Sequence, residues 1–453
     1  MATQPDPFTV MRSRAYLRLL VAAAVLGVPI ATAAYWFLQL VAVAQTWLFD
    51  DLPDALGHAQ APRWWPLLIL GVGGLLVGLT VRYLPGRGGH SPADGLVAGA
   101  GPPGPSDLPG IAVAAFATLA CGSVLGPEAP LIALGGGLAY LAVKTVQPGM
   151  PAETGAVVGA TGSFAAISTL LGSPLPGAFL LMEASGLGGA TATLVLVPGL
   201  LAAGVGALIF VGLDSLTGYG VFSLAVPDLP PVTQLHAIEF VWAVVLGLAA
   251  APVCWAIQHA ARALRTYADR QPVFMTPLMG LTIAALAILY ATVSDKPYDE
   301  VLFSGQSALP GLISQSADYS VGTLLLLVVC KGLAYVCALS SFRGGPVFPA
   351  MFVGAAGGVA LSHLPGLPLV PAVAIGISAM TAGALKLPLT AVLLTTLFLG
   401  SDGVAVMPLA ITASVVSYVT TVRLMPAPPT STSAGQAGAV PPQAGAPASE
   451  PVG

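Results

Sequence analysis

Apolar residues fill long stretches of this chain without a single Asp, Glu, Lys or Arg. Within each stretch the residues are apolar on every side, with no regular alternation of polar and apolar positions. A helix needs about 20 such residues to cross a bilayer, and several stretches are long enough for two passes or for a broken helix. The pattern therefore predicts roughly ten to fourteen membrane-embedded helical segments. The stretches are Leu19–Phe49, Trp64–Val81, Leu108–Pro127, Thr154–Met182, Phe240–Ala261, Gln271–Ser294, Gly344–Leu385, Leu387–Ser401 and Gly403–Val422.

The composition supports a membrane protein and argues against other classes. Of 453 residues, 56% are hydrophobic and 8% charged, whereas soluble domains carry about 25% charged residues. Strands of a membrane barrel alternate over about 10 residues, which these stretches do not, so we expect an all-α, polytopic membrane protein. Without a basic patch we expect no nucleic-acid partner. The cysteines lack metal-ligand spacing, so we expect small buried side chains and no metal or other cofactor; they are Cys121, Cys254, Cys330 and Cys337.

The order of polar and apolar segments divides the chain into three parts. Residues 1–15 form a short polar lead, residues 16–422 a membrane domain, and residues 426–453 a Pro-, Ala-, Gly- and Ser-rich tail that we expect to be disordered. The first apolar run is too long for a signal peptide, so we interpret it as the first helix of a multi-pass protein of the cell membrane. Three arginines precede it and predict a cytoplasmic N-terminus: Arg12, Arg14 and Arg18.

The membrane domain contains signs of an internal repeat. A charged connector, Arg262–Arg270, separates two halves of about 16–261 and 271–422. In the first half Gly126–Pro130 is followed after four residues by Gly135, and in the second Gly345–Pro349 is followed after four residues by Gly354. Each half also has a later Pro-Leu pair, at Pro174-Leu175 and Pro388-Leu389. Broken segments at corresponding places predict a repeated transporter with a site near the midplane, although 54 Gly and 41 Pro leave room for coincidence.

Three segments have the pattern of Gly followed by Pro that suits the start of a helix. Proline is tolerated in the first turn, glycine lets a ligand approach the backbone, and the free N–H groups with the helix dipole attract an anion. No Lys or Arg is required at such a site, which suits a conduit because the ion must also be released. The candidate anion-binding residues are Gly88, Gly89, His90, Ser91 and Pro92; Gly126, Pro127, Ala129 and Pro130; and Gly345, Pro346, Val347, Phe348 and Pro349.

Glu128 is the most informative single residue in the sequence. It lies inside the apolar stretch from Leu108 to Val143, where a carboxylate is costly and points to function. At the start of a helix it would compete with an anion for the same place, and protonation would clear that place. The competing interpretation is a carboxylate that only caps its helix.

These motifs resemble those of the CLC family of chloride channels and chloride/proton antiporters. Gly126–Pro130 with Gly135 resembles the family's G-[KR]-E-G-P-x-x-x-x-G, Gly345–Pro349 resembles G-x-F-x-P, and Gly88–Pro92 resembles G-S-G-I-P. Gly172–Gly177 with Glu183 resembles N-A-P-L-A-G followed by paired acids. The resemblance implies an inverted-repeat fold of broken and tilted helices and a homodimer with one anion pathway per subunit. It places the gating glutamate at Glu128 and the anion sites at the loops around it.

Several departures from the family pattern bear on the mechanism. Gly89 stands where the family has an ion-facing serine, no Tyr occurs around Pro426–Thr430, and Val347 replaces an aromatic residue, which would widen the path. Pro127 and Pro346 cannot donate a backbone N–H. Each lost hydrogen bond to an ion is worth about 1.5–3 kcal/mol, so we expect weak central binding and shallow anion selectivity. Ala184 stands where the family's antiporters have their inner proton-transfer acid, which favours a channel or a loosely coupled carrier.

The sequence therefore predicts passive or weakly coupled transport of small inorganic anions, chloride first, gated by Glu128. A chloride/proton antiporter is the main alternative, and a member that no longer conducts is another. An intramembrane enzyme using Glu128 would need a second acid, His or metal cluster that the sequence does not supply. His90 could be a pH-sensitive contact or a polar residue of a water-filled vestibule. Lys331 and Lys386 could add positive potential to an ion path or extend to the membrane interface.

Overall fold

The protein was analysed as a computed structural model that describes residues 7–96, 101–168, 170–186, 189–220, 226, 229–232 and 234–425. Helices make up nearly all of the regular structure in these described ranges. Gly126 and Gly345 form an isolated β-bridge. The all-α prediction is confirmed. The expected disorder of residues 426–453 and the missing Tyr around Pro426–Thr430 fall outside the described residues.

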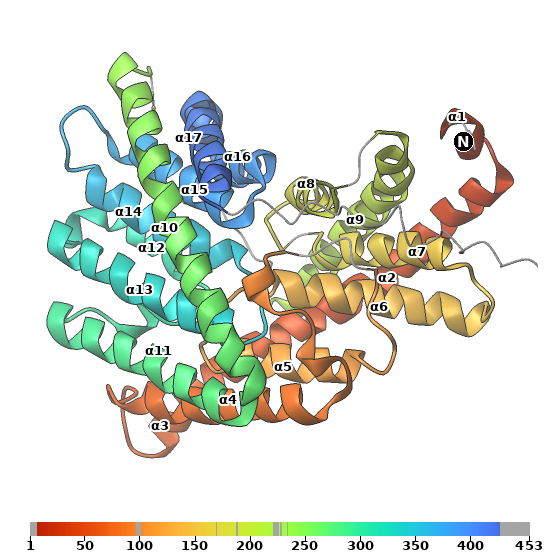
Figure 1. Ribbon diagram of the computed structural model, residues 1–453, viewed down its shortest axis with the longest axis horizontal. Coiled ribbons are helices and arrows are strands. Elements are labelled where there is room, and N and C mark those ends of the chain that lie inside the picture. Colours follow the sequence, from red (N-terminus) through yellow and green to blue (C-terminus); the bar gives the residue numbers. More distant parts are fainter. Residues whose placement is uncertain are drawn as a thin grey trace, which may run out of the picture.

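In the described residues the first half contributes nine α-helices, with short turns between several of them (Figure 1). The long helix α2 begins at Arg14, so part of the expected polar lead is helical. Between α4 and α5 the chain forms only two 3₁₀ turns, Pro85–Gly88 and Pro92–Asp94. The helices are α1 (Pro7–Met11), α2 (Arg14–Thr46), α3 (Leu52–Ala55), α4 (Trp65–Tyr83), α5 (Leu108–Ala120), α6 (Glu128–Val146), α7 (Ala152–Ala166), α8 (Pro174–Ser185) and α9 (Gly189–Thr217).

Up to Met425, where the described part of the chain ends, the second half contributes eight α-helices on the other side of the molecule (Figure 1). The charged connector Arg262–Arg270 is the C-terminal part of the longest helix, α10, which ends directly before Gln271. The helices are α10 (Ala237–Arg270), α11 (Pro272–Ser294), α12 (Ala308–Ser314), α13 (Val321–Ser341), α14 (Val347–Leu361), α15 (Leu369–Leu385), α16 (Pro388–Phe398) and α17 (Gly403–Leu424).

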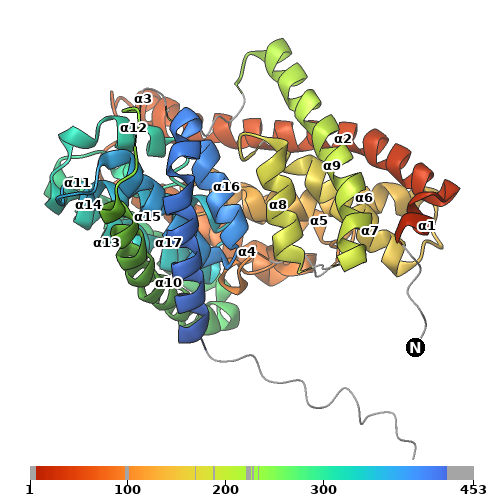
Figure 2. The same cartoon turned by 90° about the horizontal axis from the view of Figure 1, so that it is seen from above.

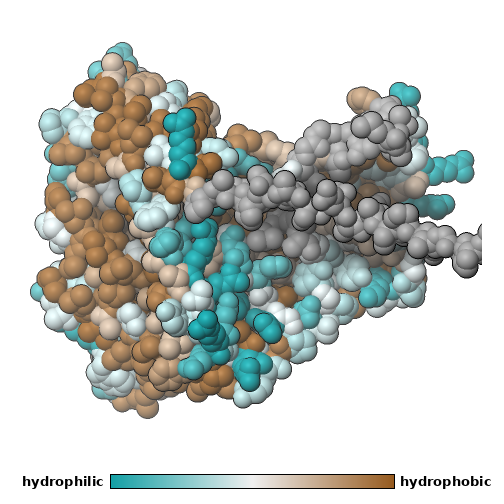
Figure 3. All heavy atoms as spheres, in the orientation of Figure 1, coloured by the Kyte–Doolittle hydropathy of each residue, from teal (hydrophilic) through white to brown (hydrophobic). Residues whose placement is uncertain are grey.

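Length and composition let most of these helices cross or enter a membrane. In the described part of the chain, eight spans are long and apolar enough to cross; they contain α2, α4, α6, α9, α10, α11, α13 and α17. The helices α5, α14, α15 and α16 are apolar but shorter. Broad areas of hydrophobic side chains cover the side formed by the second half (Figure 3), including exposed Val241, Val245 and Leu248 of α10. This surface suits contact with lipid, as expected from the sequence.

The two halves contain corresponding elements and pack against each other. In each half a helix ends at a Gly-rich loop, and the next helix begins there: α5 precedes α6, and α13 precedes α14. Both α8 and α16 begin at the repeated Pro-Leu pairs and contact each other, as Figure 2 shows. Helix α4 packs along α11, which also joins the halves. The broken, repeated helices predicted from the sequence are therefore present.

The glycines that follow the two repeated motifs have the same packing role. A side-chain carbon on Gly135 would overlap the backbone carbonyl of Gly162 in α7, and one on Gly354 would overlap that of Gly376 in α15. Small residues let helix backbones approach closely in membrane proteins. The spacing shared by the two motifs thus fixes where α6 crosses α7 and where α14 crosses α15.

We expect Gly354→Ala to destabilise the protein strongly, because the added methyl group would force α14 away from α15. Overpacking a close-packed contact costs about 1–3 kcal/mol. Gly357→Ala in the same helix is the matched control, since its added carbon would meet nothing within 4 Å, and Ala favours a helix over Gly by up to about 1 kcal/mol. Thermal unfolding in detergent should show a lower Tm for Gly354→Ala alone. Equal Tm values for both variants would contradict this account of the crossing.

Candidate functional site

The two Pro-bearing loops of the repeated motifs meet at the centre of the protein. Gly126 N–H donates to the carbonyl of Gly345 at 2.8 Å, and Gly345 N–H donates back to the carbonyl of Gly126 at 2.5 Å. Each loop continues through a proline, Pro127 or Pro346, which precedes the first residue of α6 or α14. Two helix N-termini, each with free N–H groups and a positive dipole end, therefore converge at one point.

Glu128, the first residue of α6, places its carboxylate between these two helix ends. The residue is 1% exposed, and its Oε1 accepts a hydrogen bond of 3.1 Å from the backbone N–H of Phe348 in α14. Its Oε2 is buried without a partner in the described part of the chain. A side-chain carbon on either Gly126 or Gly345 would overlap the carboxylate. The glycines thus make room for a negative group that reaches across to the opposite helix.

The prolines reduce the number of donors at this point, as the sequence indicated. Neither Pro127 nor Pro346 has an N–H. On the α14 side the first amides are those of Val347 and Phe348, and the second of these is taken by Glu128. The side chains of Val347, Phe348 and Pro349 are all buried. Few amides therefore remain to bind an ion while the carboxylate is in place.

Tyr335 of α13 is a polar group at this centre that sequence reasoning missed. Its side chain is buried, and its hydroxyl donates to the carbonyl of Pro346 at 2.8 Å. The phenol also lines a small inner cavity beside Pro346. Tyr335 precedes Pro346 by 11 residues, and only the fold shows that its hydroxyl reaches the loop that follows α13.

The inner cavity next to Tyr335 has a volume of about 220 Å³, and both basic and acidic side chains line it. Arg262 and Lys386 line it, so Lys386 faces a cavity near the candidate pathway. Burial and the neighbouring Arg262 lower the pKa of Lys386. The acid Asp94, which also lines the cavity, forms an ion pair with Arg265. Positive charge is therefore available to an anion entering here.

Glu183, the other acid of the inner cavity, caps a helix. Its two carboxylate oxygens accept backbone N–H groups at the start of α16, from Leu389 at 3.0 Å and from Thr390 at 2.8 Å. The hydroxyl of Thr390 adds a third bond at 2.7 Å. The adjacent Ala184 packs against the hydrophobic core. The carboxylate is thus occupied by structural bonds, and Ala184 has no group that could carry a proton.

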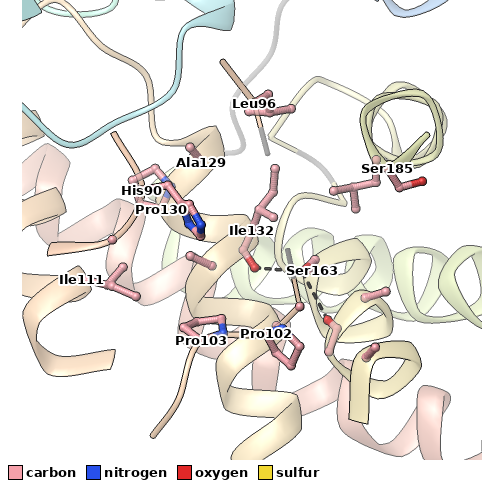
Figure 4. Close-up of a pocket in the computed structure, with 18 of the residues that line it drawn as sticks. His90, Leu96, Pro102, Pro103, Ile111, Ala129, Pro130, Ile132, Ser163 and Ser185 are labelled. Atoms are coloured by element: carbon pink, nitrogen blue, oxygen red, sulfur yellow. Dashed lines mark hydrogen bonds between the residues drawn. The ribbon is translucent and has the colours of Figure 1, made fainter. Parts of the chain in front are cut away.

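The prediction that Gly88–Pro92 opens a helix is wrong. The chain there makes one 3₁₀ turn, Pro92–Asp94, and Gly95 then takes a positive φ of 85° that ends the turn. The segment instead lines a wide cavity of about 790 Å³ together with Ala129 and Pro130 of α6 (Figure 4). A single turn has no useful helix dipole, so any anion contact here must come from side chains or single amides. His90 is exposed and lines this cavity, as a vestibule residue would.

Lys331 does not extend to the membrane interface. It is 0% exposed, and its Nζ donates to the carbonyls of Glu300 at 2.8 Å and Leu302 at 2.9 Å. The ring of Phe352 lies 4.2 Å from the ammonium group. Backbone carbonyls therefore satisfy this lysine inside the protein.

The predicted burial of the cysteine side chains is confirmed, since all four are buried free thiols.

The fold and the site together are those of a polytopic membrane protein made of broken helices, in which two helix N-termini meet at a buried acid. Comparison with known proteins identifies the family. The family model described as voltage gated chloride channel matches residues 73–422, so the chain belongs to the voltage-gated chloride channel family, whose members are transporters or channels.

Similar proteins agree with this assignment. The "Putative ion-transport protein YfeO" of Escherichia fergusonii is 29% identical over 354 residues, covering 77% of this chain and 80% of that protein. The protein of the same name in Escherichia coli gives the same identity and coverage. Among solved structures, a slow cyanobacterial Cl⁻/H⁺ antiporter has a TM-score of 0.73 at 20% identity, covering 90% of this chain and 95% of that one. A CLC-type fluoride/proton antiporter has a TM-score of 0.68 at 19% identity, covering 90% and 96%. The structural matches show the fold.

Proposed function

We propose that this protein moves small inorganic anions, chloride first, across the cell membrane by a passive or weakly coupled pathway gated by Glu128. The observation that carries the proposal is the bond from the Phe348 amide of one helix end to the carboxylate of Glu128 on the other. A helix N-terminus that binds a carboxylate can bind a halide in its place. We further propose a homodimer with one pathway in each subunit and a cytoplasmic N-terminus.

Gating follows from competition for one set of donors. While Glu128 is ionised it occupies the amide of Phe348 and excludes an anion. A proton on the carboxylate removes its charge, weakens this bond and frees the amide. The remaining donors are few because Pro127 and Pro346 have no N–H, so an anion binds weakly and leaves readily, as conduction requires.

Weak coupling to protons is supported by the acids of the inner cavity. Asp94 is paired with Arg265, and Glu183 is held by three bonds to the start of α16. Ala184 adds no titratable group. A proton passing Glu128 therefore meets no free carboxylate among the described residues that line this cavity. Catalysis is not part of the proposal, because the hydrogen-bond partner of Glu128 is a backbone amide.

Chloride/proton antiport is the second candidate, because the similar solved structures include proton-coupled antiporters of chloride and of fluoride. Proteoliposomes loaded with chloride and diluted into low-chloride buffer separate the two. Chloride efflux and external pH are recorded together. We expect efflux without matching uphill proton movement. A fixed ratio of protons to chloride would establish antiport instead, and absence of anion flux would reject both.

A further inference from the structure

Helices α4 and α11 lie side by side and antiparallel, so one end of each lies on either face of the membrane domain. A side-chain carbon on Gly74 would overlap the backbone of Pro277 in α11. One on Gly78, further along α4, would overlap the carbonyl of Pro272 at the start of α11. The last turn of α4 therefore lies beside the corner where α10 ends and α11 begins (Figure 1).

This corner carries three exposed arginines. Arg82 lies in the last turn of α4, and Arg270 lies in the last turn of α10. Arg87 follows in the turn after α4, where its carbonyl, not its side chain, accepts a bond from Arg343. All three side chains are exposed, and among the described residues none of them forms an ion pair. We call Arg82, Arg87 and Arg270 the basic cluster.

The acids closest in the sequence to the basic cluster are already engaged. Asp94 and Asp269 both form ion pairs with a fourth arginine, Arg265. The next acid along the chain, Asp107, accepts bonds from its own loop, from Gly104 N–H and from the hydroxyl of Ser106. The basic cluster therefore keeps its positive charge, and a negative partner has to come from outside the chain.

The opposite end of the same two helices has the reverse charge. Arg63, just before α4, forms an ion pair with Asp295, just after α11. Most other charged residues of the segments around this end are acids: Asp50, Asp51, Asp54, Asp299 and Glu300. Positive residues are enriched at the cytoplasmic ends of membrane helices. The basic cluster therefore faces the cytoplasmic leaflet, whose anionic lipids attract arginine and lysine.

Aromatic and apolar side chains next to the basic cluster place it at the level of the lipid headgroups. Tyr83 follows Arg82 directly, and Tyr267 precedes Arg270 by one turn; both rings are strongly exposed. Tyrosines with exposed rings are typical of the membrane–water boundary. On α11, exposed Phe274 and Leu278 continue from this corner as an apolar surface. Hydrophilic side chains over the C-terminal half of α10 adjoin hydrophobic areas in Figure 3.

We propose that the basic cluster binds the phosphate of an anionic phospholipid, with its acyl chains along Phe274 and Leu278. A guanidinium group can donate two parallel hydrogen bonds to a phosphate, and arginine stays charged in this setting. A lipid fits better than a soluble phosphate compound because the apolar surface of α11 begins at the same corner. The site is separate from Glu128 and does not depend on the proposed anion pathway.

Native mass spectrometry of the full-length protein in detergent tests the site by counting bound lipids as phosphatidylglycerol is added. Phosphatidylcholine with the same acyl chains is titrated in parallel. We expect the wild type to bind phosphatidylglycerol about tenfold more tightly. Arg82→Gln and Arg270→Gln should each weaken this binding about fivefold, and the double variant about twenty-fivefold, because each arginine contributes separately to the attraction.

Arg423→Gln is the matched control, because Arg423 is also exposed in the last turn of a membrane helix, α17, but lies outside the basic cluster. It should bind phosphatidylglycerol as the wild type does, and phosphatidylcholine binding should be the same in all variants. Arg82→Lys and Arg270→Lys keep the charge and should lose less affinity than the Gln variants. This pattern would support the site.

Four results would overturn the inference. Equal wild-type affinity for the two lipids would mean that the arginines contact ordinary surrounding lipid. An equal loss in Arg423→Gln would mean that total charge, not this cluster, attracts the lipid. Displacement of phosphatidylglycerol by millimolar glycerol phosphate would assign the cluster to a soluble phosphate compound. Conversion of a dimer to a monomer in the double variant would mean that a second copy covers the cluster. None of these measurements requires ion flux, so none bears on gating by Glu128.

Discussion

Glu128→Ala is expected to remove the pH dependence of anion efflux and to raise the efflux rate at neutral pH by about tenfold or more. The carboxylate of Glu128 is bound to the Phe348 amide between two helix ends. Each bond to a charged group is worth about 1.5–3 kcal/mol, which corresponds to a factor of ten or more in occupancy. Removing the side chain frees that amide at every pH. Efflux from proteoliposomes between pH 5 and pH 8 provides the measurement.

Glu128→Gln separates the charge of the side chain from its size. The amide oxygen of Gln can still accept the bond from Phe348, but it does not titrate. We therefore expect pH-independent efflux that is slower than in Glu128→Ala. Glu183→Gln is a matched control, because Glu183 also binds the start of a helix but stands at α16. It should keep the pH dependence of the wild type. Unchanged pH dependence in both Glu128 variants would show that another group gates the path.

The sequence could predict those features of the fold that follow from a short stretch of residues alone. Apolar runs of membrane-spanning length became helices, because lipid leaves the backbone no other partner. Gly126–Pro130 and Gly345–Pro349 each begin a helix, and their equal spacing to Gly135 and Gly354 indicated a repeat. The structure adds that both of these glycines lie at close helix crossings. The repeat predicted a site near the midplane, and the reciprocal Gly126–Gly345 bonds bring the two repeated loops together at the centre of the protein.

The features that the sequence could not predict depend on contacts between distant segments. Arg343 reaches the carbonyl of Arg87, 256 residues away in the chain, only because the helices return to the centre. The bond from Tyr335 to Pro346 spans only 11 residues, but it depends on how the loop after α13 turns back toward that helix. The Gly88–Pro92 motif has the residues of a helix start, but the positive φ of Gly95 ends the helix after one turn. The residues of this motif indicated where a helix begins, but they did not indicate that it stops after one turn.

Lys331 shows how a contact between distant segments supports the site. Its Nζ binds the carbonyls of Glu300 and Leu302, and Phe303, the next residue, donates its N–H to the carbonyl of Gly122 at 2.9 Å. Gly122 lies four residues before Gly126. A buried ammonium of the second half thus holds a loop that braces the segment leading into the first ion loop. Phe303 itself has a positive φ of 55°, a conformation that needs such support.

Lys331→Met should therefore be among the most destabilising single changes in the protein. Met keeps much of the length of the side chain but leaves the buried carbonyls of Glu300 and Leu302 without their donor. Breaking a buried charged contact by removing one partner costs about 3–5 kcal/mol. Lys144→Met is the matched control, because Lys144 also lies over an aromatic ring, 5.3 Å from that of Tyr140, but is exposed.

Surface substitutions usually change stability by less than about 0.5 kcal/mol, so thermal unfolding in detergent should show a large fall in Tm for Lys331→Met and almost none for Lys144→Met. Because the brace ends near Gly126, Lys331→Met protein that remains folded should also conduct with weaker pH dependence, as Glu128 loses its fixed position opposite Phe348. A Lys331→Met protein with wild-type Tm and wild-type pH dependence would show that the Glu300–Phe303 loop keeps its conformation without the lysine. The alignment of the ion loops would then depend on the Gly126–Gly345 bonds and not on this lysine.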